Sequence, residues 1–184
     1  RPLTNEEEEK ARQILSTRSN AVVVDHFNIE MTTVQIQCLK NLTWLNDEVI
    51  NFYMELLKAR NMELLKARRT KLKCHFFNTF FYPKLIQGRG GSEVYTYKNV
   101  QRWSKRAKIK IIEQDKVFAP IHVGQNHWCM ACINFKQKRF EYYDSLGGFN
   151  DACLGHLRRY VQDEANTYSK DVEFDLKGWQ DYTP

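Results

Sequence analysis

Two apolar runs in the second half of the chain constrain its fold most, because they have the pattern of adjacent β-strands. They cover residues 127–135 and 139–144, and a short basic turn that includes Lys136 and Lys138 connects them. A connection this short favours an antiparallel hairpin. The first run begins at His127 and the second ends at Asp144, so the hairpin brings a histidine and an aspartate onto neighbouring strands.

This His–Asp pair has the composition of two members of a nucleophilic triad. In such a triad the carboxylate fixes the imidazole tautomer, and the imidazole activates a Ser or Cys. If Gln137 and Lys138 form a two-residue turn, Asp144 pairs with Ala131, on the same face as His127 but four residues from it. Four residues of strand span about 13 Å, so a bulge, a strong twist or a staggered register must bring the pair together. Each residue alone has a simpler interpretation, as a polar residue at a strand edge and as an Asp that ends a strand.

The remaining patterns predict an α+β domain. Capping signals at Thr4, Thr32 and Asn46 or Asp47 precede segments with helical character. The aromatic run 75–82 fits either a strand or a helical turn, which periodicity cannot distinguish. Helices that flank a run of adjacent strands favour a mainly antiparallel sheet, and 184 residues with 42% hydrophobic content favour a single domain. We expect helices at about 4–16, 32–42, from 46 or 47 onward, 97–107 and 151–165, and strands at about 21–27, 109–112, 117–123, 127–135 and 139–144.

The long helix contains a literal repeat of eight residues. The segments 54–61 and 62–69 share the sequence MELLKAR and differ in their last residue. Eight residues at 100° each rotate the second copy by about 80° relative to the first, so one apolar stripe cannot serve both copies equally. We interpret residues 54–69 as a duplicated, solvated extension of the helix, with a functional appendage as the alternative.

Composition limits the classes of protein to which the chain can belong. No apolar run approaches the roughly 20 residues of a membrane span, so no membrane partner is expected. The five cysteines are scattered and odd in number, which favours a reducing compartment. The formal charge of +6 favours an acidic partner, and nucleic-acid binding has only this composition behind it. No cofactor or metal is expected, because a zinc site from Cys129, Cys132, His122 and His127 would need two cysteines that face opposite sides of a strand.

Six motifs occur in a characteristic order along the chain. They are WLNDEVINFY at 44–53, FNTFF at 77–81, VQRW at 100–103, PIHV at 120–123, HW at 127–128 and YYDSLGG at 142–148. Together they closely resemble the Ulp/SENP family of SUMO-specific cysteine proteases, over nearly the whole chain. The resemblance implies a papain-like fold in which His127 is the general base and acid and Asp144 orients it.

The same resemblance implies a set of substrate contacts. Trp44 and Trp128 match the lids of a narrow tunnel that admits the substrate's C-terminal Gly-Gly. The physics is consistent, since only glycine lets an extended backbone pass between two indole rings; the alternative is two core tryptophans. The further matches are Asp47, Phe80 and Arg102, at positions that contact the SUMO surface, and Lys84, which matches less specifically.

The nucleophile of the family is missing from these motifs. The family supplies it from a later Asp-Cys-Gly motif that follows a Gln, and the sequence contains no such motif. We therefore expect a catalytic domain that is truncated at its C-terminus, with the Cys and the oxyanion-hole Gln beyond Pro184 and no turnover by this chain alone. Cys129 lies two residues from His127, but in an apolar run where an inert thiol is expected.

The functional hypothesis is a SUMO-specific cysteine protease, both an isopeptidase and an endopeptidase that processes the SUMO precursor after Gly-Gly. A non-catalytic SUMO-binding pseudoprotease is the alternative. The expected partners are SUMO and SUMO-conjugated proteins. The resemblance also implies a nuclear location, with the cytoplasm as a second one, and the sequence leaves the oligomeric state and the preference among ubiquitin-like proteins open.

Overall fold

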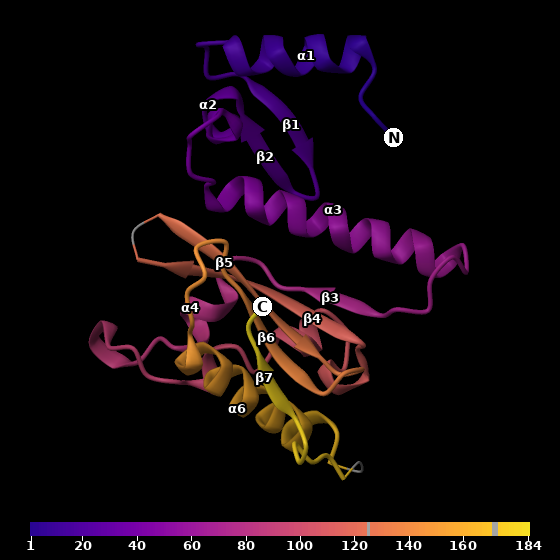
Figure 1. Cartoon of the computed structure of the whole chain (residues 1–184), viewed down its shortest axis with the longest axis vertical. Helices are drawn as coiled ribbons and strands as arrows, with labels where there is room; N and C mark the ends of the chain where they lie inside the picture. The colour runs from indigo at the N-terminus through magenta and orange to yellow at the C-terminus, as the bar shows by residue number, and fades with distance from the viewer. Residues whose placement is uncertain (125, 171–172) are drawn as a thin grey trace. The chain divides into compact units, whose positions relative to one another are not determined.

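The computed structural model describes residues 1–124, 126–170 and 173–184 of the chain (Figure 1). The chain forms two compact units, Arg1–Glu55 and Leu56–Pro184, and each is described by itself. The boundary falls within the long helix α3 (Asp47–Lys66). The expectation of one catalytic domain over residues 1–184 stays a prediction.

Side-chain caps define the short helices of the first unit. Thr4 and Glu7 each accept a hydrogen bond from the other's backbone amide, and Thr32 and Gln35 do the same at the next helix. Both capping boxes confirm what the sequence predicts. The elements are α1 (Asn5–Ser16), β1 (Val22–His26), β2 (Ile29–Thr32), α2 (Thr33–Ile36), the 3₁₀ helix η1 (Gln37–Leu39) and the first part of α3.

The helix α3 runs without a break through the first copy of the repeat and into the second, as far as Lys66. It begins after Asn46, whose Oδ1 accepts a hydrogen bond from the backbone N–H of Val49 at 3.0 Å. The two copies differ in environment although their letters agree. Met54 is 4% exposed, whereas Met62, at the same place in the second copy, is 50% exposed. This difference is what a rotation of about 80° between the copies predicts.

A five-stranded sheet in the order β3-β4-β5-β6-β7 forms the centre of the second unit (Figure 1). The three central strands pair antiparallel, as expected, and the two shorter edge pairings are parallel, so the sheet is mixed. Helices and this sheet together confirm the α+β class. The strands are β3 (Cys74–Phe76), β4 (Lys116–Val123), β5 (His127–Asn134), β6 (Arg139–Tyr143) and β7 (Gln180–Tyr182).

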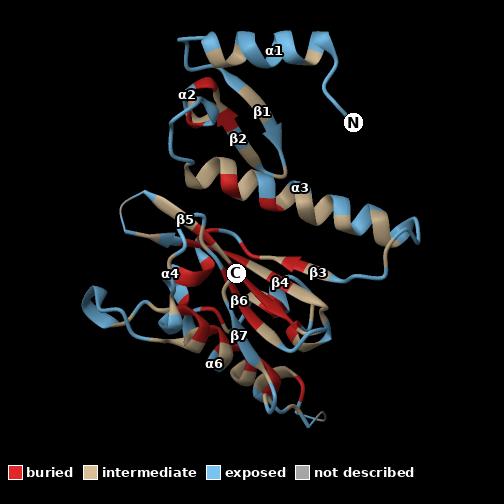
Figure 2. Cartoon of the chain, viewed as in Figure 1, coloured by how far each residue is buried: buried red, intermediate tan, exposed pale blue. Residues whose placement is uncertain are grey.

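The helix α6 (Asp151–Tyr168) packs on β5 and β6 and covers the core of the second unit, as the buried residues in Figure 2 indicate. Asn150 caps it, because its Oδ1 accepts a hydrogen bond from the N–H of Cys153 at 2.9 Å. No helix of the described residues has the length and apolar content of a membrane span. The shorter elements are α4 (Phe81–Leu85), η2 (Arg89–Gly91), η3 (Tyr97–Asn99), α5 (Trp103–Arg106) and η4 (Ile111–Glu113).

Three expected elements differ from the structure. The expected helix at 32–42 is divided into α2 and η1, and it ends at Leu39. The expected helix at 97–107 is divided into η3 and α5, because the side-chain amide of Asn99 donates to the carbonyls of Lys84 and Gln87 and holds η3 against that loop. The expected strand at 109–112 is instead the 3₁₀ turn η4, in which Ile111 is buried. A short apolar run has no periodicity that separates a strand from a buried turn. The aromatic run 75–82 supplies both β3 and the start of α4.

Candidate active site

The register of the β5–β6 hairpin places His127 and Asp144 near each other. Asn134 pairs with Arg139 and Met130 pairs with Tyr143. The same register, continued by one residue, sets Asp144 opposite position 129, not opposite position 131 as a two-residue turn predicts. The turn is four residues long, at 135–138. Because the register shift is even, the side chains keep the predicted face, and the offset along the strand falls to two residues.

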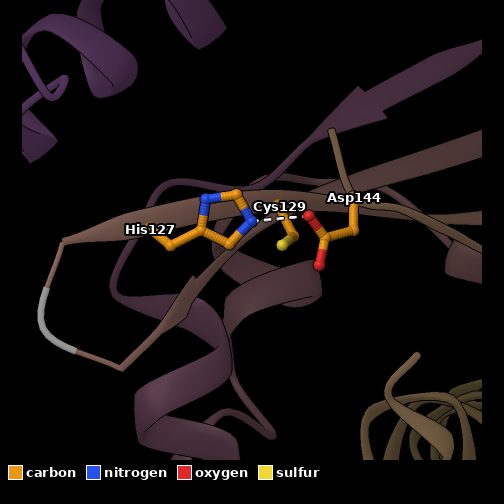
Figure 3. Close-up of side chains that lie close together, drawn as sticks. All are labelled: His127, Cys129 and Asp144. Carbon is orange, nitrogen blue, oxygen red and sulfur yellow. Dashed lines mark hydrogen bonds and ion pairs between the residues drawn. The ribbon is translucent and has the colours of Figure 1, made fainter. Parts of the chain in front are cut away.

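The two side chains meet in a short hydrogen bond. His127 Nε2 lies 2.6 Å from Asp144 Oδ1, and the two side chains are 15% and 8% exposed (Figure 3). The predicted adjacency is therefore present, and the longer turn explains how it arises. The roles of base and orienting group for these residues stay a proposal.

Backbone groups of the following loop hold the Asp144 carboxylate. The N–H of Leu146 donates to the carboxylate oxygen Oδ1 at 2.8 Å. The N–H of Gly147 donates to the backbone carbonyl of Asp144 at 3.0 Å, which holds the loop itself. Gly147 has a φ of 73°, a conformation that favours glycine. Two hydrogen bonds lower the pKa of Asp144 below its usual value. The bond from Leu146 has the larger effect, and the bond with His127 comes second. The carboxylate is thus held in its ionised form.

Gly148 leaves the space that the second carboxylate oxygen occupies. A Cβ built at this position would collide with Oδ2 of Asp144. A side chain at 148 would therefore displace the carboxylate. The sequence pattern indicates only a turn at Gly147-Gly148. It does not predict the contact with Leu146, because the donor there is a backbone N–H that does not depend on the side chain.

The ionised carboxylate determines the chemistry of the imidazole. A neutral histidine has one nitrogen that donates and one that accepts. Because Asp144 accepts, Nε2 carries the proton and Nδ1 has the lone pair. Nδ1 is thus the atom that would exchange a proton with a nucleophile.

The five cysteines are poor candidates for that nucleophile. Cys129 is 6% exposed, and burial, with the charge of Asp144 as a smaller cause, raises the pKa of its thiol. A reactive thiol needs a lowered pKa and some exposure. Burial also raises the thiol pKa of Cys74, Cys132 and Cys153, to about 12 for Cys153, and Cys38 is buried.

The chain matches a family model described as the Ulp1 protease family, C-terminal catalytic domain, over residues 43–184. The chain belongs to the Ulp1 protease family. It is 43% identical over 185 residues to ubiquitin-like-specific protease 1A of Arabidopsis thaliana, covering 97% of this chain and 35% of that protein. It is 38% identical over 153 residues to sentrin-specific protease 2 of Homo sapiens, covering 83% of this chain and 23% of that protein. The chain thus spans about a third or less of the length of these relatives.

A solved structure supports the same family assignment for the fold. The C-terminal Ulp1 protease domain in complex with Smt3, the yeast ortholog of SUMO, superimposes with a TM-score of 0.78 and 29% identity. The alignment covers 100% of this chain and 75% of that chain. This likeness confirms the Ulp1-like fold that the motifs predict.

The six predicted substrate contacts of this Ulp1-family chain are divided between the two units. Trp44 and Asp47 belong to the first unit, and Trp44 is 56% exposed, so it is not a core residue. In the second unit Trp128 pairs with His122 across β4 and β5, with ring centroids 4.4 Å apart. The contact roles of Trp44, Asp47 and Trp128 stay predictions.

The other three predicted contacts lie on the surface of the second unit. Phe80 is 53% exposed, and together with Lys84 it lines a shallow groove of about 380 Å³. Arg102 is exposed at the N-terminus of α5. The exposure of all three is what a contact with a protein partner requires, and their roles stay predictions.

Among the described residues, three side chains with metal-binding atoms cluster at the site. One donor atom each from His127, Cys129 and Asp144 lies within 4.8 Å of the others. The combination differs from the four-residue zinc site rejected on the sequence, because His122 and Cys132 are not part of it.

Proposed function

We propose that this chain is the part of a SUMO-specific cysteine protease that carries the catalytic base and its orienting carboxylate. The enzyme hydrolyses the bond after the C-terminal Gly-Gly of SUMO, in the precursor or in an isopeptide linkage to a target lysine. The observation that carries the proposal is the 2.6 Å hydrogen bond between His127 Nε2 and Asp144 Oδ1. Membership of the Ulp1 family and the relative solved with Smt3 support the substrate class.

The proposed reaction follows from the geometry of the imidazole. Nδ1 of His127 accepts the proton of a cysteine thiol, and the thiolate attacks the carbonyl carbon of the terminal glycine. The imidazolium, stabilised by Asp144, donates its proton to the leaving amine as the peptide or isopeptide bond breaks. Water, deprotonated by His127, then hydrolyses the thioester and restores the thiol.

We propose that the attacking thiol comes from outside residues 1–184. The five cysteines of the chain are buried or have a raised thiol pKa, which opposes formation of a thiolate at neutral pH. Solved relatives have a catalytic cysteine, as the Ulp1 structures with that residue oxidised to a sulfinic or sulfonic acid indicate. A single thiol supplied by another segment fits the proposed role of Nδ1 as the atom that accepts the thiol proton.

The proposed selectivity rests on aromatic and charged side chains. We propose that Trp44 and Trp128 each contact the extended Gly-Gly backbone of the substrate, because a side chain on either substrate residue would collide with an indole ring. Asp47, Phe80, Lys84 and Arg102 would contact the folded surface of SUMO. These contacts separate recognition of the folded partner from selection of its C-terminus.

A fluorogenic SUMO substrate tests the proposal. The natural protein that contains these residues should cleave it in a thiol-dependent reaction, and a ubiquitin substrate should be cleaved far more slowly. Asp144→Asn should lower kcat by on the order of 10² to 10⁴. Cys132→Ala, a change in the core on the neighbouring strand β5, should leave kcat unchanged. The isolated 184-residue chain should bind SUMO without turnover. Thiol-dependent turnover by that chain would contradict the assignment of an outside nucleophile.

The pseudoprotease remains the second candidate. It predicts SUMO binding without cleavage by any natural form of the protein, so the same assay separates the two. The nuclear location stays a prediction, which the distribution of the tagged natural protein between nucleus and cytoplasm tests.

A further inference from the structure

Three chemically different metal ligands share one face of the β5–β6 hairpin. His127 and Cys129 are two residues apart on β5, so their side chains point the same way, and Asp144 follows β6 opposite Cys129. One donor atom of each lies within 4.8 Å of the other two. Figure 3 shows the thiol of Cys129 beside the line that joins the imidazole to the carboxylate.

We propose that His127, Cys129 and Asp144 form a binding site for Zn²⁺ or a similar thiophilic divalent ion, and that the bound ion blocks the catalytic pair. Imidazole nitrogen, thiolate sulfur and carboxylate oxygen are the ligands that Zn²⁺ takes in proteins. Bonds of about 2.0 to 2.3 Å at tetrahedral angles place ligand atoms about 3.3 to 3.8 Å apart. The three donors therefore need side-chain shifts of only about 1 Å, and a water molecule can complete the coordination.

The surroundings of Asp144 favour this rearrangement. The Leu146 N–H holds Oδ1, while Gly148 presents no Cβ to Oδ2. The carboxylate can therefore turn Oδ2 toward an ion and keep its backbone hydrogen bond. The His127 and Asp144 side chains are 15% and 8% exposed, so both remain in contact with solvent.

The positions of the protons explain why a bound ion would inhibit proton transfer by His127. Coordination at Nε2 moves the imidazole proton from Nε2 to Nδ1, and coordination at Cys129 releases the thiol proton to solvent. Nδ1 then donates and cannot accept a proton from a nucleophile. The hydrogen bond between His127 and Asp144 is replaced by two bonds to the metal. Inhibition rests on the proposed function, whereas binding does not.

Titration of the folded 184-residue chain with Cd²⁺ and Zn²⁺ in metal-buffered solution tests the binding. Wild type should bind one ion per chain, with a thiolate-to-Cd²⁺ charge-transfer absorption. Cys129→Ala should remove that absorption and weaken Zn²⁺ binding by at least about 10-fold, and Asp144→Asn should weaken it by a similar factor. Cys132→Ala is the matched control, because Cys132 is also buried on β5 and lies outside the cluster.

The outcomes separate this inference from the proposed function. Equal affinity in wild type and Cys129→Ala, or a loss confined to Cys132→Ala, would overturn the metal site. If Cys129→Ala does not fold, the Asp144→Asn result decides in the same way. Metal binding by a chain whose natural protein cleaves no SUMO would leave the site standing and reject the protease. A protease whose turnover is unaffected by saturating Zn²⁺ would reject the inhibition.

Discussion

The position of the Asp144 carboxylate depends on a glycine four residues further along the chain. Gly148→Ala should push Oδ2 away and lengthen the contact with His127, because the added Cβ collides with that oxygen. Gly155→Ala is the control, since nothing lies within 4 Å of its Cβ and it sits inside α6. The control should raise the free energy of unfolding by about 0.5 to 1 kcal/mol. Urea melts and the His127 ring signals in NMR check both variants, and equal behaviour of the two would contradict the packing argument.

The lowered pKa of Asp144 also predicts how stability depends on pH. The usual value is 3.8 and the folded value is lower, so the unfolded chain binds a proton at this group at higher pH than the folded chain. Its contribution to stability is present above that usual value and is lost as pH falls through the folded pKa. Asp144→Asn removes the contribution. Urea melts at about pH 6 and about pH 3 should show a smaller acid-induced loss in the variant than in wild type; equal losses would oppose this assignment.

At the scale of one element, the repeat in α3 offers a matched pair of substitutions. Met54 is 4% exposed and Met62 is 50% exposed, although both begin the same seven-letter sequence. Met54→Ala should cost about 2 to 5 kcal/mol of unfolding free energy, the range for a buried methionine. Met62→Ala should change it by less than about 0.5 kcal/mol. Chemical denaturation of both variants measures the difference, and similar costs would show that the two copies are equivalent.

Local signals in the sequence predicted the caps and the hairpin, whereas register depended on a contact that the pattern did not reveal. The side chain of Asn134 accepts a hydrogen bond from the N–H of Gln137 at 3.1 Å, and Lys138 has a φ of 51°. These two features make a four-residue turn from a sequence that suggests a two-residue one. Asn134 at the end of the strand was the available signal.

Tertiary packing explains the elements that the patterns predicted wrongly. Asn99 ties η3 to the carbonyls of Lys84 and Gln87, which lie more than ten positions earlier in the chain. The spacing of apolar residues along the segment does not predict a contact with so distant a part of the chain. The apolar run at 109–112 becomes the buried turn η4, because its burial is against α6 and not in the sheet. Burial alone was predictable there, and the type of element was not.

The candidate site shows the same division between local and distant information. The residue types and the shared face of His127 and Asp144 follow from strand periodicity. Their 2.6 Å contact follows from the turn length, and the Gly148 packing follows from the path of the loop. The predicted surface contacts such as Arg102 came from resemblance alone.

At the scale of the whole molecule, charge should contribute to recognition of the partner. The chain has a formal net charge of +6, and Arg102 is exposed. Arg102→Ala should weaken SUMO binding by about 2- to 5-fold, the size expected for an exposed charge pair. Lys138→Ala is the control, because Lys138 is exposed in the turn at the opposite end of β5 and β6 from the site. Titration of labelled SUMO measures both, and an equal effect would point to net charge in place of a specific contact.

The proposed chemistry depends on Asp144, which holds His127 in the tautomer that a base requires. Long-range ¹⁵N–¹H correlation spectra of the histidine-labelled chain measure the tautomer directly. We expect that Nε2 carries the proton and Nδ1 the lone pair. Asp144→Asn, whose amide can donate to Nε2, should shift the ring toward the Nδ1–H form. A wild-type ring already protonated on Nδ1, or a tautomer that the substitution leaves unchanged, would rule out this role for Asp144.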